Sequence, residues 1–332
     1  MAILRHHRRR LSQRLVGVLL GLGATVESAS WASSRAGRSV GRERNTTTDV
    51  LRDAMECERQ VADRCNGINV FEEPSGACPP WDAAVDLMPP PAAALFAGVT
   101  ATDLGCISRS LGFGRLLWCL ARGPAVRTAL ELFTGTGGGS TLLLAHALAA
   151  GAGGRPQHLL SVERDVRNVA HAIEVLQVSG VKLGGFVHLG GATGLEPSEL
   201  PELVARPGPW LLHGDLLQYK GLLELLCQAV GGLDLVMLDP PIGVDLERVW
   251  PGLDRACKPR FVAVHNANLR GHAGWLRHQL LADPGGEWQE AASGSHPSPW
   301  EAVDREIGFL GDDGELTAGR RTWSLLARRD PL

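Results

Sequence analysis

The chain has 332 residues, of which 44% are hydrophobic and 21% are charged. Its length leaves room for one large domain with extensions or for two small domains. These proportions exclude wholesale disorder and a multi-span membrane protein. The net charge of −3 gives no drive toward nucleic acid, but it is unevenly distributed. Residues 1–48 hold nine arginines against two acidic residues, a net charge of +7, so the remaining chain carries −10.

Residues 1–34 predict a removable targeting segment. An arginine-rich start, an apolar run over Leu15–Val26 and a patch of small residues follow one another, as in a secretory signal. The run is shorter than the roughly 20 residues that span a bilayer, so no stable transmembrane span is expected. We therefore expect the secretory pathway or an extracellular location. The alternative is an organelle transit peptide, because the segment is rich in arginine and serine and nearly free of acids.

Residues 35–100 form a predicted N-terminal extension that is rich in cysteine and proline, with one helix over Thr48–Arg64. The first four cysteines of the chain are Cys57, Cys65, Cys78 and Cys106. In an oxidising lumen they are expected to staple this extension, because their spacing matches no zinc pattern. The other three, Cys119, Cys227 and Cys257, lie in apolar stretches that are typical of core residues.

Strand-like and helix-like segments alternate in residues 101–330, the predicted main domain. The expected strands are 126–133, 157–162, 185–189, 233–238, 260–264 and 322–327, and the expected helices are 103–122, 140–150, 166–178, 216–230 and 271–281. Residues 194–212, which contain four prolines, have the pattern of an insertion over the sheet edge. The alternation predicts an α/β fold with a doubly wound, mainly parallel sheet. Ligands of such sheets bind at the carboxyl ends of the strands.

A glycine-rich turn follows the first predicted strand, which itself contains Glu131. The turn includes Thr134, Gly135 and Gly137, and glycine lets the backbone approach a ligand closely. The helix after it presents unpaired N–H groups. A carboxylate within an apolar strand is costly to bury without a partner, and the ammonium group of S-adenosylmethionine would be one. Glu163 ends the second strand, where a carboxylate accepts hydrogen bonds from ribose hydroxyls.

These motifs resemble the class I S-adenosylmethionine-dependent methyltransferase superfamily, and their layout is closest to the catechol-type small-molecule O-methyltransferases. The resemblance runs from Ala125 to Ala327. Phe133 departs from it, because the family usually has its first glycine there. The resemblance implies a Rossmann-like fold with S-adenosylmethionine as the cofactor. The implied cofactor-binding residues around the first two strands are Glu131, Thr134, Gly135, Gly137 and Glu163.

Two later positions compete for the adenine ring. Ala192, after the third strand, is similar to the adenine-lining loop of catechol-type enzymes. Asp215, which ends the sequence Trp210–Asp215, is placed to accept from the adenine amine instead, or it caps the following helix. The sequence leaves these alternatives open.

Asp239, His265 and Asn266 follow the fourth and fifth strands. In the catechol-type enzymes the similar positions hold an acid and an acid–Asn pair that bind magnesium, so all three are candidate catalytic and metal-binding residues. Histidine in place of the acid favours manganese, iron or zinc. Alternatively His265 is a general base without a metal, or the residues form a polar turn. The lysine base of the catechol-type enzymes is missing near Asp239.

The sequence therefore predicts S-adenosylmethionine-dependent methyl transfer to a hydroxyl of a small molecule, with or without a divalent metal ion. One alternative is N-methylation of nucleic acid, because Asp239-Pro240-Pro241 resembles a motif that holds flipped bases. Ile242 replaces the aromatic ring of that motif, and the acidic body lacks a basic track, so nucleic acid is disfavoured. The other alternative is a scaffold protein with the same fold and a decayed site, suggested by Phe133, by the missing lysine and by His265.

Overall fold

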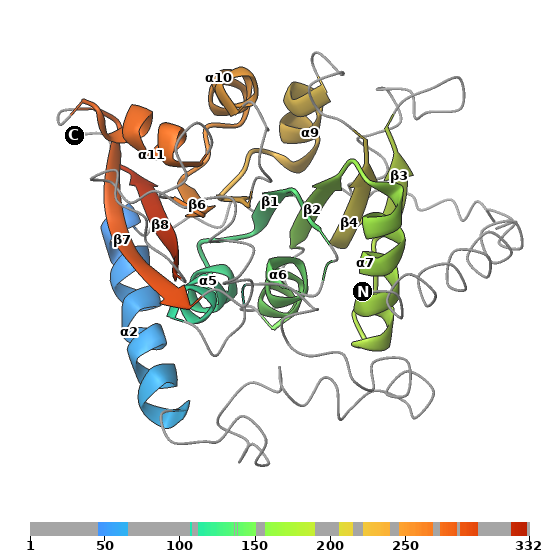
Figure 1. Cartoon of the computed structure of the whole chain (residues 1–332), viewed down its shortest axis with the longest axis horizontal. Coiled ribbons are helices and arrows are strands. Elements are labelled where there is room, and N and C mark those ends of the chain that lie inside the picture. The colour runs from blue at the N-terminus through green and yellow to red at the C-terminus, as the bar shows by residue number, and fades with distance from the viewer. Residues whose placement is uncertain are drawn as a thin grey trace, which may run out of the picture. The chain divides into compact units, whose positions relative to one another are not determined.

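An eight-stranded sheet forms the centre of the fold (Figure 1). The computed structural model describes residues 46–65, 107, 112–135, 137, 139–150, 157–189, 206–214, 222–239, 246–267, 273–283, 286–297 and 320–330. The strands are β1 (Thr128–Leu132), β2 (His158–Glu163), β3 (Gly185–His188), β4 (Gly208–His213), β5 (Leu235–Leu238), β6 (Phe261–His265), β7 (Trp288–Pro297) and β8 (Arg320–Arg328). Their order is β3-β4-β2-β1-β5-β6-β8-β7. Strands β1 to β6 are parallel, and β8 is antiparallel to both β6 and β7.

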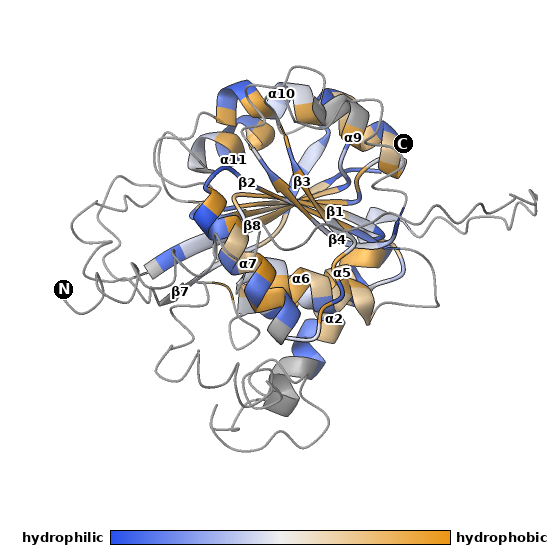
Figure 2. Ribbon diagram, turned by 90° about the vertical axis from the view of Figure 1, so that its right-hand side faces the viewer, coloured by the Kyte–Doolittle hydropathy of each residue, from blue (hydrophilic) through white to orange (hydrophobic). Residues whose placement is uncertain are grey.

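Helices cover both faces of this sheet. They are α2 (Thr47–Cys65), α5 (Gly112–Arg122), α6 (Ser140–Ala149), α7 (Val166–Val178), α9 (Leu222–Val230), α10 (Leu246–Cys257) and α11 (Ala273–Leu281). Figure 2 shows the apolar strands between α9, α10 and α11 on one side and α2, α5, α6 and α7 on the other. Alternate residues of each central strand enter the two cores, which is why strands such as β1 and β5 are buried throughout. The predicted doubly wound α/β fold is confirmed.

The sequence reading missed two strands. Strand β4 lies in the segment that was predicted to be an insertion over the sheet edge, and it instead pairs with β2 and β3 inside the sheet. Its apolar run, Trp210–Leu212, is only three residues long and follows Pro207 and Pro209, so the prolines concealed it. Strand β7 was missed because alanine, glycine, proline and glutamate, which are depleted in strands, make up half of it.

Helix α2 confirms the predicted helix at Thr48–Arg64 and packs on the main domain. Val50, Leu51 and Ala54 enter the core that α5 also lines. A disulfide joins Cys57 of α2 to Cys119 of α5, with the two Cα atoms 5.7 Å apart. The expectation that the first cysteines staple the extension to itself is therefore wrong for Cys57.

The N-terminus of α2 is held by the far end of the described chain. The Asp330 carboxylate accepts from the Thr47 backbone N–H at 2.8 and 3.0 Å and from the Thr47 hydroxyl at 2.8 Å. The Arg260 guanidinium donates to the same hydroxyl oxygen at 3.0 Å. These contacts satisfy a helix N-terminus that offers unpaired N–H groups.

A second disulfide joins Cys227 of α9 to Cys257 of α10, with the Cα atoms 5.2 Å apart. Both residues are buried, as is Cys119, which confirms the prediction that these cysteines lie in the core; the sequence did not indicate that they form disulfides. Cys78 and Cys106, like the predicted targeting segment 1–34, lie outside the described residues. Within the described part of the chain, every helix is too short or too polar to cross a bilayer.

Candidate functional site

The sheet order reverses at β1, which has β2 on one side and β5 on the other. This switch point is where doubly wound sheets bind their ligands. The structure brings the strand-end candidates to this edge: Glu131, Thr134, Gly135 and Gly137 at β1, Glu163 at β2, Asp239 at β5, and His265 and Asn266 at β6. Ala192 and Asp215 lie outside the described residues.

Glu131 is fully buried, and three hydroxyl groups pair with its carboxylate. Oε1 accepts from Ser140 Oγ at 2.5 Å, and Oε2 accepts from Thr141 Oγ1 and Ser161 Oγ, both at 2.6 Å. Burial raises the pKa of Glu131, and the nearby charge of Asp239 adds to this effect, while the three hydroxyls oppose it. The carboxylate thus ties β1 to β2 and to the first turn of α6. The sequence reading sought an ammonium partner and missed these hydroxyls.

The two predicted turn glycines are required for different reasons. Both have positive φ angles, 58° at Gly135 and 77° at Gly137. A Cβ atom at Gly137 would lie 2.5 Å from Ala172 Cβ, so this glycine lets the turn pack on α7. A Cβ atom at Gly135 would have no heavy atom of the described residues within 4 Å. Gly135 therefore borders open space at the switch point.

Glu163 holds the glycine-rich turn in place. Its Oε2 accepts from the Gly135 backbone N–H at 2.8 Å, and its Oε1 accepts from the Asp165 backbone N–H at 2.8 Å. A carboxylate has about four lone-pair sites, so each oxygen retains capacity for a ribose hydroxyl.

The Thr134 hydroxyl is buried and has no hydrogen-bond partner within the described part of the chain. Buried hydroxyls are normally paired, so this one indicates a place for a polar ligand atom. It lies one residue before the open space at Gly135. The turn therefore fits a polar, close-lying ligand such as S-adenosylmethionine.

Phe133 adopts the backbone conformation of a glycine. Its φ is 72°, in the left-handed region, and its N–H donates to the Val162 carbonyl at 3.0 Å. This conformation costs a non-glycine residue about 1–2 kcal/mol. The side chain is half-buried against the core on the α9–α10 side of the sheet. The chain thus keeps the turn geometry that the resemblance implies, although phenylalanine replaces the family's glycine.

Asp239 receives two N–H groups on one oxygen. The Oδ1 atom lies 2.9 Å from His265 Nδ1 and accepts from Asn266 Nδ2 at 3.0 Å. Because a carboxylate only accepts, His265 Nδ1 carries a proton in this pair. The side chain of Asp239 is 26% exposed, whereas that of His265 is 0% exposed. The trio therefore turns its carboxylate, not its imidazole, toward solvent.

An aromatic stack covers His265. The Phe113 ring lies 5.9 Å from the imidazole at an interplanar angle of 12°, and Trp323 stacks on Phe113 at 5.1 Å. The sequence interpretation of His265 as the base that meets the acceptor does not fit this burial. Asp239 has the most exposed side chain of the trio.

The donor set of the trio does not fit a metal ion as the sequence suggested. His265 Nδ1 and Asn266 Nδ2 direct their N–H groups at Asp239 Oδ1, so neither of these two atoms offers a lone pair to a cation. The Asn266 amide oxygen instead faces Arg321 Nη1 at 3.5 Å. Among the described residues, no three His, Cys, Asp or Glu side chains are placed to share a metal ion.

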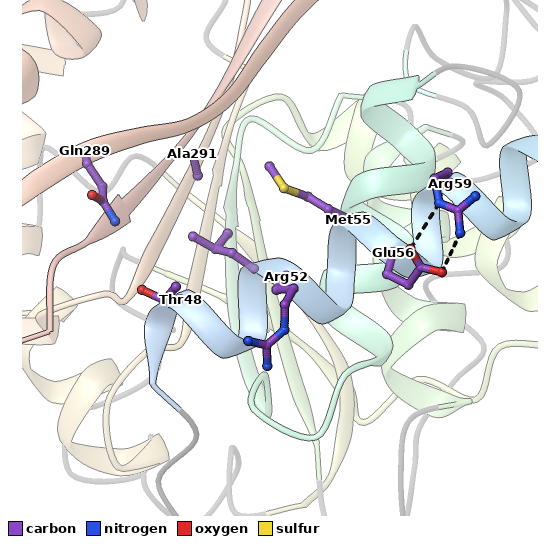
Figure 3. A pocket seen from close by; sticks show the side chains of 8 residues that line it. Thr48, Arg52, Met55, Glu56, Arg59, Gln289 and Ala291 are labelled. Atoms are coloured by element: carbon purple, nitrogen blue, oxygen red, sulfur yellow. Dashed lines mark hydrogen bonds and ion pairs between the residues drawn. The ribbon is translucent and has the colours of Figure 1, made fainter.

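A surface groove lies elsewhere, between α2 and β7 (Figure 3). Leu51, Met55 and Ala291 contribute apolar side chains to it, and Arg59 on its wall is paired with Glu56 at 2.7 Å. None of the candidate site residues lines this groove, so it is separate from the switch point.

The chain is similar to known proteins in structure but not in sequence. No protein family and no curated protein matches the sequence. The structure of an O-methyltransferase from Bacillus cereus in complex with SAH is similar, with 13% identity and a TM-score of 0.42 over 83% of this chain and 100% of that chain. A putative O-methyltransferase from Klebsiella pneumoniae shows 17% identity and a TM-score of 0.42 over the same shares.

The human methyltransferase 10 domain containing protein is similar at 11% identity and a TM-score of 0.36, over 76% of this chain and 97% of that chain. The identities are all below 25% and the TM-scores all below 0.5, so the likeness concerns the fold alone.

Proposed function

We propose that the chain is an S-adenosylmethionine-dependent methyltransferase that acts on a hydroxyl group of a small molecule. The observation that carries this proposal is the unpaired, buried Thr134 hydroxyl beside the open space at Gly135. Both lie on the glycine-rich turn at the switch point, where doubly wound sheets hold their ligands. Glu163 stands at the neighbouring strand end with lone pairs for a ribose diol.

Strand β4 favours Asp215 over Ala192 as the adenine partner. Strand β4 pairs directly with β2, and His213 is the register partner of Glu163. Asp215 is only two residues beyond that strand end in the sequence. Ala192 instead follows β3, which is separated from β2 by β4. We therefore assign the adenine amine to Asp215 in this proposal.

Asp239 is the proposed proton acceptor. When bound, S-adenosylmethionine would supply an electrophilic methyl carbon and a neutral thioether leaving group, so that transfer to the acceptor hydroxyl would leave one proton to be taken up. The partly exposed carboxylate of Asp239 takes up this proton. His265 and Asn266 orient the carboxylate through their N–H groups.

Binding measurements test the proposal. In titration calorimetry S-adenosylmethionine should bind the wild-type chain, and NAD should not. Thr134→Val keeps the shape of the side chain but removes the hydroxyl, so it should weaken binding about tenfold, the equivalent of about 1.4 kcal/mol. The exposed His278 of α11 offers a control, because His278→Gln should leave binding unchanged.

Absence of S-adenosylmethionine binding would refute the proposal and favour the scaffold alternative. Tritium transfer from labelled S-adenosylmethionine to a panel of phenols and aliphatic alcohols then identifies the acceptor. RNA binding that rises steeply as salt falls, together with methylation of RNA, would favour the nucleic-acid alternative instead.

We also propose that the chain folds in an oxidising compartment, which agrees with the predicted secretory signal. Two disulfides between different helices support this proposal, because such bonds are rare in reducing compartments. Mass spectrometry of non-reduced peptides from the native source should find Cys57 linked to Cys119 and Cys227 linked to Cys257. Alkylated free thiols at these four positions would contradict it.

A further inference from the structure

We propose that Arg321 is a positioning residue that, through Asn266, prepares Asp239 to accept a proton without a metal ion. This inference rests on the proposed function, but it concerns a residue and a property of the site that the sequence motifs do not indicate. Arg321 lies on β8, outside every motif that resembles the family.

The first step is the orientation of the Asn266 amide. A guanidinium group only donates hydrogen bonds, and Arg321 Nη1 lies 3.5 Å from Asn266 Oδ1. The amide oxygen therefore faces Arg321, and the amide N–H₂ faces Asp239 Oδ1 at 3.0 Å. The partners of an asparagine decide which end of its amide points where. Arg321 thereby sets Asn266 as a donor to the carboxylate.

The second step is that the sheet fixes this arrangement. His265 of β6 is the register partner of Trp323 on β8, two residues from Arg321. The next residue, Asn266, has a φ of 58°, a left-handed conformation that asparagine tolerates better than most residues. Its neighbour Ala267 donates its N–H to the Thr322 carbonyl at 3.2 Å, which continues the link between the two segments. The backbone thus places Arg321 beside the trio.

The third step is the charge of the site. An acid pair with a divalent cation, the arrangement of the resembled family, is neutral in sum. Here the single negative charge of Asp239 stands near the single positive charge of Arg321, with neutral Asn266 between them. A divalent cation at Asp239 would meet the guanidinium as a like charge and would find no amide oxygen turned toward it. Arg321 therefore takes the electrostatic role of a metal ion.

Metal titration tests this inference without S-adenosylmethionine. Calorimetry with MgCl₂ and with MnCl₂ should show binding to the wild-type chain weaker than about 1 mM. The double variant His265→Asp with Arg321→Met restores an acid and removes the opposing cation, so it should bind Mn²⁺ at least about tenfold more tightly. Wild-type binding of Mn²⁺ tighter than about 0.1 mM would overturn the inference.

Kinetics test the positioning role. Arg321→Met should lower kcat about tenfold to a hundredfold, which is the usual effect of losing a residue that orients a reactive group through another residue. The Kd for S-adenosylmethionine should stay unchanged. Arg321→Lys should restore part of the kcat, because it keeps the charge but not the planar donor. The exposed Arg255 of α10 gives the control, and Arg255→Met should leave kcat unchanged. Circular dichroism checks that each variant is folded.

These experiments distinguish failure of the inference about Arg321 from failure of the proposed methyltransferase function. If S-adenosylmethionine does not bind, the proposed function fails, while the metal titration still reports on the trio. If it binds and wild-type turnover requires added Mn²⁺ after treatment with EDTA, the metal-free assignment is wrong. If turnover survives EDTA but Arg321→Met matches the wild type, the positioning role is wrong.

Discussion

The substitution Gly137→Ala tests whether the glycine-rich turn needs this glycine in order to pack on α7 or only in order to accommodate a ligand. In Gly137→Ala the new Cβ atom would lie 2.5 Å from Ala172 Cβ and 2.6 Å from Ala172 Cα. Because one of these atoms is backbone, α7 must move to relieve the contact. The positive φ of 77° adds the ordinary cost of a left-handed alanine. The substitution therefore combines overpacking with backbone strain.

The variant Gly135→Ala is a matched control, because it separates the cost of backbone strain from the cost of overpacking. Gly135→Ala introduces the same type of strain at a φ of 58°, but its Cβ atom meets no atom of the described residues within 4 Å. Strain alone costs about 1–2 kcal/mol in both variants, and overpacking adds about 1–3 kcal/mol in Gly137→Ala. We therefore expect losses of about 1–2 kcal/mol and about 2–5 kcal/mol, respectively, out of a total stability of about 5–15 kcal/mol.

Urea unfolding, followed by circular dichroism without added ligand, measures both losses. The reasoning is refuted if Gly137→Ala loses no more unfolding free energy than Gly135→Ala. A change in the m-value would have to be excluded before the two midpoints are compared.

Three further predictions concern stability. Burial raises the pKa of Glu131 above 4.5, so its contribution to stability is fully present below that pH and is lost as the pH rises through the raised pKa. Glu131→Gln has no such titration, so urea unfolding should show it gaining stability relative to the wild type as the pH rises above 4.5. Asp330→Ala removes the partner of Thr47 and should cost about 1–2 kcal/mol, with faster proteolysis of α2 in a time course. If cleavage of α2 stays at the wild-type rate, this contact does not hold the helix. Replacing Cys227 and Cys257 by serine opens a loop of 30 residues and should cost about 3 kcal/mol by urea unfolding. Dithiothreitol should abolish the difference from the wild type if the bond is its cause.

The features that the sequence predicted well are local. Glycines after a short apolar strand fix a turn at the switch point, and the acids and amides that end parallel strands must share one edge of the sheet. Glu131, Glu163, Asp239 and Asn266 lie at one edge of the sheet, as these two rules predict. Parallel strands run in the same direction, so their carboxyl ends lie at the same edge of the sheet whatever the packing of the side chains.

The features that the sequence concealed depend on contacts between distant segments. Ser161 lies 30 residues from Glu131, and Arg321 lies 55 residues from Asn266, so neither pairing has a spacing that identifies it. The disulfide partners cannot be deduced from the number of cysteines. The orientation of the Asp239 trio, which decides between metal binding and proton transfer, is also a property of the packed side chains.

The attachment of α2 has a consequence for how the protein tolerates cleavage. Any single cut between Cys57 and Cys119 would leave two peptides joined by their disulfide, with Thr47 still bound by Asp330 at the start of the helix. Such a nicked protein would migrate as one species on a non-reducing gel and as two after reduction. Cleavage of the chain in this region therefore does not have to release α2, because the disulfide keeps the two peptides covalently joined.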